Sequence, residues 1–273
     1  MNPHQLSIIP VYFSPTGTSK KIASELIKSI NPTNEEEPIE LTYETPVSTI
    51  INDNKLVIIS MPVYGGHLPS IAVSRFKQVQ GNKTPAIITV TYGNRDYEKA
   101  LAELAELATS QGFHIIGAST FIGEHSYSTS TYPIAVGRPD QRDSLCVFSF
   151  GKAILKKIQK YDFSTVDIHN IPCLQQSEDA IKNFIEGVTL LHKSPTALPK
   201  TPVIKKIESC THCGKCVHLC PTSAIRIGNE TDTNNEKCIK CCACVKGCPT
   251  QARILESPYA PILSANFNVR KDP

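Results

Sequence analysis

The sequence of 273 residues predicts an α/β fold in which a doubly wound, five-stranded parallel sheet is followed by a small α+β module. As far as about residue 160, apolar runs of strand length alternate with helix-like segments, which is typical of a parallel sheet with crossover helices. Beyond that point the composition changes, because nine of the eleven cysteines lie between Cys210 and Cys248. A chain of this length can bury one sizeable core and also build a smaller module.

Each predicted strand is a short apolar run that ends at a polar or glycine-containing loop. The five strands are expected at Leu6–Phe13, Ile39–Tyr43, Lys55–Met61, Ala86–Thr91 and Phe113–Ile122. The first intervening helix places Ile22, Leu26, Ile27 and Ile30 on one face and ends at Asn31-Pro32. A second helix places Leu101, Leu104, Ala105 and Ala108 on one face before Gln111-Gly112, and a last helix is expected from Ser144 to Lys160.

The remaining chain divides into a connection, a cysteine-rich module and a tail. The sheet domain is assigned to residues 1–160 and the connection to residues 161–202, with a helix expected at Ser177–Leu191. Prolines follow that helix at Ser194-Pro195, Leu198-Pro199 and Thr201-Pro202, which indicates a semi-stiff spacer. The cysteine-rich module occupies residues 203–259, and residues 260–273 form a tail without periodic signal.

Composition excludes several classes of function. The N-terminus has no basic leader or small-residue cleavage site, and no apolar run reaches the length of a membrane span, so we expect a soluble, cytoplasmic protein. The formal charge of +3 comes from scattered lysines and arginines without a basic run, which argues against a nucleic-acid partner. Cysteines crowded into one segment indicate metal ligands rather than a disulfide scaffold.

The cysteines form two equally spaced runs. Each run follows C-x2-C-x2-C-x3-C-P, and the second repeats the first 28 residues later. Such duplication implies two pseudo-symmetric halves. Zinc sites and disulfides are the alternatives, but zinc sites usually separate two cysteine pairs by a long loop. The spacing resembles that of bacterial two-cluster ferredoxins, in which the fourth cysteine of each run binds the other four-iron four-sulfur cluster.

That resemblance implies two ligand sets, each combining three cysteines of one run with the fourth of the other. The first cluster would be held by Cys210, Cys213, Cys216 and Cys248, and the second by Cys238, Cys241, Cys244 and Cys220. Cys242 is an extra thiol in the second run and is expected to be a bystander or a replacement ligand. Cys146 is expected in the core, and Cys173 has no assigned role.

A hydroxyl-rich loop follows the first predicted strand and precedes the first helix. Its residues are Ser14, Pro15, Thr16, Gly17, Thr18 and Ser19. Hydroxyls and free N–H groups at a helix N-terminus make an anion site, although plain helix capping is the commoner reading of such residues. The stretch resembles the phosphate loop of flavodoxins, which implies FMN. Neither a dinucleotide fingerprint nor a P-loop occurs in the chain.

Loops after the third and fourth strands correspond, by the same resemblance, to those that enclose the flavin ring. The candidate contacts are Pro62, Val63, Tyr64, Gly65 and Gly66 in one loop, and Thr91, Tyr92, Gly93, Asn94 and Tyr97 in the other. Gly65 or Gly66 would let the backbone approach and hydrogen-bond the ring, and the tyrosines would stack on it. A fourth loop, Gly123–Ser128, places His125 near the same crevice as a candidate hydrogen-bond partner or proton donor, although a histidine without a role there is the commoner case.

The order of the two modules resembles the flavodoxin/ferredoxin fusion proteins. The resemblance implies an electron-transfer protein that passes electrons between FMN, two clusters and an external redox partner protein. An FMN-dependent reductase of a small molecule, or an NAD(P)H-linked oxidoreductase fed by the clusters, is the alternative. A third possibility is a first domain that has lost flavin and only docks a partner. Whether the protein is an enzyme stays open, as does its oligomeric state, a homodimer included.

Overall fold

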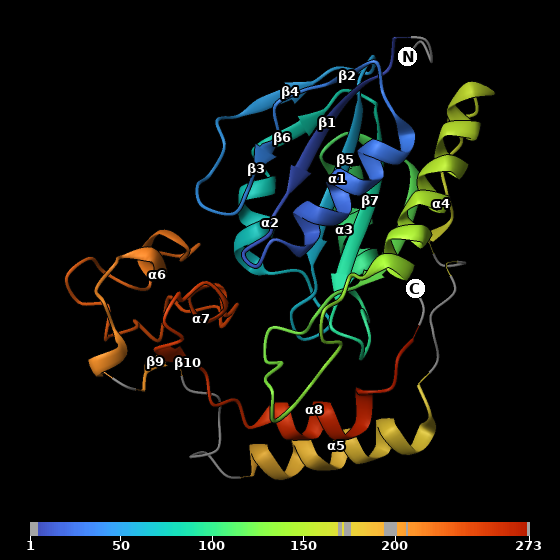
Figure 1. Cartoon of the computed structure of the whole chain (residues 1–273). Coiled ribbons are helices and arrows are strands. Elements are labelled where there is room, and N and C mark those ends of the chain that lie inside the picture. The colour runs from blue at the N-terminus through green and yellow to red at the C-terminus, as the bar shows by residue number, and fades with distance from the viewer. Residues whose placement is uncertain (1–4, 169–170, 172–175, 194–200, 206, 272–273) are drawn as a thin grey trace.

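Parallel strands form the larger of the two regions that the computed structural model describes (Figure 1). The described residues are 5–168, 171, 176–193, 201–205 and 207–271. Cys173 and the proline pairs Ser194-Pro195 and Leu198-Pro199 lie outside them. Among the described residues, no helix is both long enough and apolar enough to cross a bilayer.

The strand order identifies the fold of this larger region. Its main strands are β1 (Ser7–Tyr12), β2 (Asn34–Glu35), β5 (Leu56–Pro62), β7 (Thr84–Tyr92) and β8 (Phe113–Ile122). They run parallel in the order β2-β1-β5-β7-β8. In chain order of the five main strands this is 2-1-3-4-5, the flavodoxin-like order of doubly wound sheets, so the predicted doubly wound parallel sheet is confirmed, with a sixth short strand paired to β1.

The second predicted strand is the least regular. Instead of one strand at Ile39–Tyr43, the chain makes two-residue contacts with β1 at β2 and at β3 (Ile39–Glu40). Glu36, Glu37 and Pro38 lie between them, and proline has no N–H to donate to a ladder. A short parallel pair outside the sheet, β4 (Thr49–Ile51) with β6 (Val79–Gly81), was not predicted.

Four helices cover the two faces of the sheet. Helices α1 (Thr18–Ile30) and α4 (Gln141–Gln159) pack together over one face, where Ile22, Leu26 and Ile154 are buried. Helices α2 (Ser70–Phe76) and α3 (Ala100–Ser110) cover the other face. Alternate strand residues serve the two cores, as when Val57 faces one side and Ile58 the other, because successive side chains of a strand point to opposite faces.

Two further helices lie beyond the end of the sheet at which the strands finish (Figure 1). Helix α5 (Glu178–His192) confirms the helix expected in the connection, whereas α8 (Tyr259–Phe267) lies mostly in the tail that carried no signal. The two helices pack against each other, and Ile262 of α8 approaches Gly187 closely, since a Cβ there would lie 3.0 Å from it. The Ser264 hydroxyl donates to the carbonyl of Pro133 at 2.9 Å, which ties α8 to the loop after β8.

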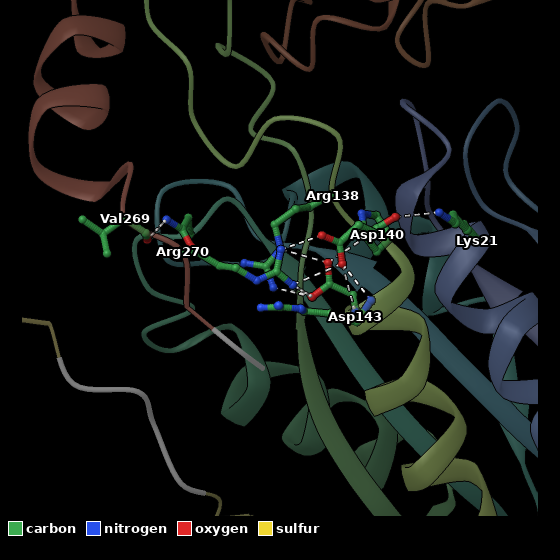
Figure 2. Close-up of polar contacts among 9 residues, drawn as sticks. Lys21, Arg138, Asp140, Asp143, Val269 and Arg270 are labelled. Carbon is green, nitrogen blue, oxygen red and sulfur yellow. Dashed lines mark hydrogen bonds and ion pairs between the residues drawn. The ribbon is translucent and has the colours of Figure 1, made fainter.

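Residues after α8 return to the sheet domain (Figure 2). Arg270 binds Asp140 at 2.5 Å, and Asp140 also caps α4 by accepting hydrogen bonds from Arg142 and Asp143. Asp143 pairs with the buried Arg138. The C-terminal residues are therefore bonded to the start of α4 and hold α8 in place.

The cysteine-rich region is small and keeps its internal repeat. A two-stranded antiparallel ribbon pairs β9 (Val203–Ile204) with β10 (Arg253–Ile254). Helices α6 (Lys215–His218) and α7 (Ala243–Lys246) begin and end 28 residues apart. Left-handed backbone conformations recur at the same offset, in the pairs His212 and Lys240, Gly214 and Cys242, and Ser223 and Gln251. The two halves share one backbone design, as the sequence repeat predicts.

Candidate functional site

A cavity of about 480 Å³ lies at the carboxyl ends of the strands, where sheets of this class bind ligands. Its size is within the usual range for ligand sites, about 300 to 1,000 Å³. Loops after β1, β5, β7 and β8 all contribute to it. Twelve of the predicted flavin-loop residues line it: Ser14, Thr16, Thr18, Ser19, Pro62, Val63, Tyr64, Gly65, Gly66, Thr91, Tyr92 and Gly93.

The other three predicted residues are not among those that line the cavity. Gly17 shapes the first loop, with φ of 85°, where its N–H donates to the carbonyl of Ser14 at 3.1 Å. Tyr97 packs edge to face on Tyr92, with ring centroids 5.7 Å apart, and so supports a residue that does line the cavity. Asn94 is buried and turns to the C-terminal segment, where its Nδ2 donates to the carbonyls of Phe267 and Val269.

Replacing Asn94 by glycine is expected to destabilise the protein by about 1 to 3 kcal/mol, because its hydrogen bonds to the last residue of α8 and to Val269 are both lost. Glycine tolerates the φ of 64° found here, so backbone strain does not contribute to the loss. Thermal unfolding of the full chain measures the effect. An unchanged melting temperature would show that the C-terminal segment is held by other contacts.

The loop after β1 has the features of a phosphate site. Helix α1 starts after Gly17, which has no side chain to cap it, and has no acidic residue in its first turn. The Ser14 hydroxyl accepts from the N–H of Lys20, the third residue of α1, at 3.0 Å and so fixes the loop against the helix. The other N–H groups of the first turn and the helix dipole favour an anion at this end.

Two hydroxyls at the cavity have no protein partner within the described part of the chain. They are the buried oxygens Ser19 Oγ and Thr91 Oγ1. Buried polar groups in native proteins are nearly always hydrogen-bonded, so each requires a partner from a ligand or water. The residues present therefore fit a ligand that carries a phosphate and further polar atoms.

Tyr64 to His67 form a tight two-residue turn at the cavity wall. The Tyr64 N–H donates to the carbonyl of His67 at 2.8 Å, and the His67 N–H donates back at 3.2 Å. Gly65 and Gly66 have φ of 61° and 85°, values that L side chains rarely adopt and that this turn requires at both positions. At Gly66 a Cβ would also collide with the side chain of Glu98, so a larger residue would force that side chain to move.

The rest of the cavity wall comes from segments far along the chain. Phe184 and Val188 of α5, Leu263 of α8 and the adjacent pair Ile239-Lys240 complete it. Tyr127 and Tyr259 add aromatic surface, and burial raises the pKa of Tyr127 and keeps its hydroxyl protonated. No sequence motif marks these residues, because their role depends on how α5, α8 and the cysteine region dock onto the sheet.

His125 lies half-buried in the cavity wall with a defined hydrogen-bonding state. Burial lowers its pKa from 6.5 to about 4, helped by the positive charges of Arg95 and Lys246, so the ring is neutral at pH 7. Its Nδ1 accepts a hydrogen bond from the N–H of Tyr127 at 3.0 Å, which places the proton of the neutral ring on Nε2. The ring lies against Gly93, where a Cβ would collide with it.

The neutral state of His125 makes stability depend on pH. Between pH 6.5 and about 4 the unfolded chain binds a proton here and the folded protein does not, so lowering the pH favours unfolding by up to about 1.4 kcal/mol per pH unit. Above pH 6.5 this residue has no effect. The free energy of unfolding, measured with denaturant at several pH values in this range, should fall less steeply with falling pH in His125→Gln than in wild type. Equal slopes would contradict the low pKa.

Cysteines from both runs meet in a second, small cavity of about 20 Å³ in the C-terminal region. It is lined by Cys220 from the first run and by Cys238, Cys241 and Cys244 from the second, together with Cys242. The Cys220 sulfur accepts a hydrogen bond from the N–H of Ala224 at 3.2 Å. This grouping is the crossed ligand set that the resemblance implies for the second cluster.

The cysteines of the other predicted set are more accessible. Cys213 is exposed, and Cys210, Cys216 and Cys248 are half-buried, whereas Cys241 and Cys244 are buried. Across the described residues, no three His, Cys, Asp or Glu side chains converge in a way that could hold a single metal ion. Cys242 is buried, and Cys146 packs at the edge of the core between α1 and α4 as expected.

Two cationic side chains join the cysteine region to the sheet domain. Lys246 of α7 binds Glu124 Oε1 at 2.5 Å and the carbonyl of Ser128 at 3.2 Å, both in the loop that carries His125. Although burial alone raises the pKa of Glu124, its hydrogen bonds with Lys246 and Gly137 lower the pKa overall and keep it ionised. Arg75 of α2 donates to the carbonyl of Pro221, the residue after Cys220, at 2.7 Å. The second cysteine set is thus held beside the cavity.

Comparison with known proteins identifies the cysteine region. A family model described as a 4Fe-4S dicluster domain matches residues 202–249. A search of curated proteins finds no significant match to the whole chain.

Solved structures similar to the sheet domain include several flavodoxins. Oxidised flavodoxin 1 from Bacillus cereus is 17% identical, with a TM-score of 0.41, over 55% of this chain and 97% of that one. Two-electron reduced flavodoxin from Megasphaera elsdenii is 14% identical, with a TM-score of 0.37, over 55% and 98%. Rubredoxin oxygen:oxidoreductase from Desulfovibrio gigas is 13% identical, with a TM-score of 0.39, over 57% and 37%.

The fold assignment of the sheet domain rests on its parallel strand order, and that of the C-terminal region on the family match. The chain therefore joins a doubly wound domain with the flavodoxin-like strand order, in its N-terminal part, to a region that matches the 4Fe-4S dicluster domain, in its C-terminal part.

Proposed function

We propose that this protein is an electron-transfer iron–sulfur flavoprotein in which FMN occupies the large cavity and two 4Fe-4S clusters occupy the cysteine region. One observation carries the proposal: Ile239 lines both the large cavity and the small cavity of Cys220, Cys238, Cys241 and Cys244. The second cluster would then lie beside the flavin. FMN supplies exchange of two electrons together or singly, whereas a cluster passes one at a time.

Different residues of the large cavity would bind different parts of FMN. The N-terminus of α1 would bind the phosphate, and the Ser19 and Thr91 hydroxyls would satisfy polar atoms of the ligand. Tyr64 and Tyr92 would pack on the ring, and Nε2 of His125 would donate a hydrogen bond. Because His125 is neutral at pH 7, it serves as a donor of a hydrogen bond and not as a charged acid.

The two sets of cysteines have different surroundings, which indicate the path that electrons would take through the protein. In the second set Cys241 and Cys244 are buried, whereas the first set has no buried cysteine and includes the exposed Cys213. Electrons would pass between the cavity and the surface through the second cluster and then the first, where a redox partner protein docks. We place the protein in the cytoplasm, a reducing compartment in which cysteines stay available as ligands.

Cofactor content tests this proposal directly. Anaerobically purified protein should contain about one flavin, and about eight iron and eight sulfide per chain, as two 4Fe-4S clusters require. Release and chromatography of the flavin should identify it as FMN. Stoichiometric zinc, or disulfides in place of iron and sulfide, would overturn the cluster assignment, and absence of flavin would overturn the cavity assignment.

A flavin-dependent reductase is the second candidate, and the apolar part of the cavity favours it. Phe184, Val188 and Leu263 lie opposite the flavin loops and leave a wall against which a small substrate could pack. Anaerobic mixing with NADH, NADPH, quinones or nitro compounds separates the two functions. Rapid flavin oxidation or reduction by one of them supports the reductase, and no reaction with any of them supports the carrier.

A further inference from the structure

The 28-residue repeat is broken at one buried position. Ile225 follows the first run, and the residue 28 positions later is Arg253 in β10. Both side chains are buried, each with about 2% of its surface exposed. The neighbouring residues keep the repeat, since Thr222 corresponds to Thr250 and Ala224 to Ala252. A charged residue thus replaces an apolar one at a matching interior site.

Arg253 has no negatively charged partner in the described part of the chain. One guanidinium nitrogen, Nη1, donates to the carbonyl of Glu230, while Nη2 donates to the carbonyl of Pro202 at 2.9 Å and to the Thr233 hydroxyl. The third, Nε, is buried without a partner among the described residues. Nη1 and Nη2 thus donate only to neutral oxygens, which leave the charge of the guanidinium uncompensated.

An isolated buried charge is costly, by several kcal/mol, unless an opposite charge lies nearby. The side chains that can supply it are the cysteines. Pro202 and Thr233, which accept hydrogen bonds from Arg253 Nη2, line the same small cavity as Cys220, Cys238, Cys241 and Cys244. The guanidinium therefore lies beside the cysteines of the second set.

We propose that Arg253 compensates the negative charge of the iron–sulfur centres and favours their reduced state, with its unpartnered Nε–H directed to sulfur. The proposal rests on the binding of clusters by these cysteines. A fixed positive charge and a hydrogen bond to sulfur both stabilise the electron-rich form of a cluster and raise its potential. The centre that contains Cys244 is the one beside the large cavity, so Arg253 favours electron transfer from the cavity to that centre.

Redox titration of the full chain, followed by electron paramagnetic resonance, tests the role of Arg253. Arg253→Ile restores the residue of the first half. At a fixed applied potential, we expect the ratio of reduced to oxidised Cys244 centre to be about tenfold lower in Arg253→Ile than in wild type. This corresponds to a midpoint potential lowered by about 59 mV. The ratio at the other centre should fall less. Arg226→Ile removes an exposed arginine from the same region and should leave both ratios within about twofold of wild type, as expected for a solvent-screened charge.

Iron and sulfide analysis of each variant separates the possible failures. Wild type without clusters would refute the proposed function itself. Arg253→Ile with full iron content and unchanged potentials would refute the role of Arg253 alone. If Arg253→Ile does not assemble its clusters, Arg253→Lys and Arg253→Gln test the role of the charge instead. Retention of clusters or potential by lysine but not by glutamine supports charge compensation, and identical behaviour of the two contradicts it.

Discussion

Replacing Cys220 by serine is expected to remove the iron–sulfur centre beside the large cavity, although Cys220 belongs to the first cysteine run. Cys220 lines the small cavity together with Cys238, Cys241 and Cys244 of the second run. The Cys220→Ser protein should therefore resemble Cys241→Ser, with about half of the wild-type iron and sulfide, because one of two clusters is lost. Flavin-to-cluster transfer should be abolished in both variants, since the missing centre is the one nearest the flavin.

Two matched variants make this result specific. Cys248→Ser should also halve the iron content but should leave rapid flavin-to-cluster transfer intact, because it belongs to the more exposed set. Cys242→Ser alters a buried thiol of the second run that is not a predicted ligand and should retain both clusters. If Cys220→Ser behaves like Cys248→Ser instead, the crossed ligand sets are wrong.

Replacing Thr18 by aspartate should weaken FMN binding at least about fivefold without destabilising the fold. Thr18 is the first residue of α1 and lines the cavity. A carboxylate there interacts favourably with the helix dipole, by about 0.3 to 1 kcal/mol, but repels the phosphate. At about 4 Å in a partly exposed site this repulsion is worth about 1 to 4 kcal/mol, and each 1.4 kcal/mol is tenfold in affinity.

Titration of flavin-depleted protein with FMN and with riboflavin, which lacks the phosphate, measures the effect. Thr18→Asp should bind FMN weakly and riboflavin nearly as wild type does, and the neutral control Thr18→Asn should bind both normally. Equal weakening for the two ligands would mean that the aspartate disturbs the cavity as a whole, and the phosphate would then have to lie elsewhere.

The parts of the fold that follow from local pattern were predictable. Continuous apolar runs such as Ala86–Thr91 appear as the buried strand β7, and the cysteine spacing reappears as helices and left-handed residues 28 positions apart. The form of the second strand was not predictable, because Pro38 and the preceding glutamates divide its pairing with β1 into two short stretches. Short elements such as β4 and β6 depend on contacts between distant segments, which no local pattern encodes.

The sequence of helix α8 has the apolar spacing of a helix, but this pattern is too weak to predict the helix. Its buried residues, Ala260, Leu263, Ser264 and Phe267, have helical spacing, but two of the four are small and one is polar. The contacts that stabilise it come from distant segments, namely α5, Pro133 and the loop of Asn94. For the same reason the loops of the cavity were predictable, whereas the wall formed by Phe184, Leu263 and Ile239 was not.

We propose that the flavin site and the second cluster lie side by side in one chain, joined at Ile239 and held by Lys246 and Arg75. Rapid anaerobic reduction of the flavin by a radical pulse, followed by the loss of cluster absorbance, tests it most directly. We predict a first-order rate that does not change with protein concentration, because donor and acceptor belong to the same molecule. A rate proportional to concentration, or flavin that stays reduced beside oxidised clusters, would contradict the account.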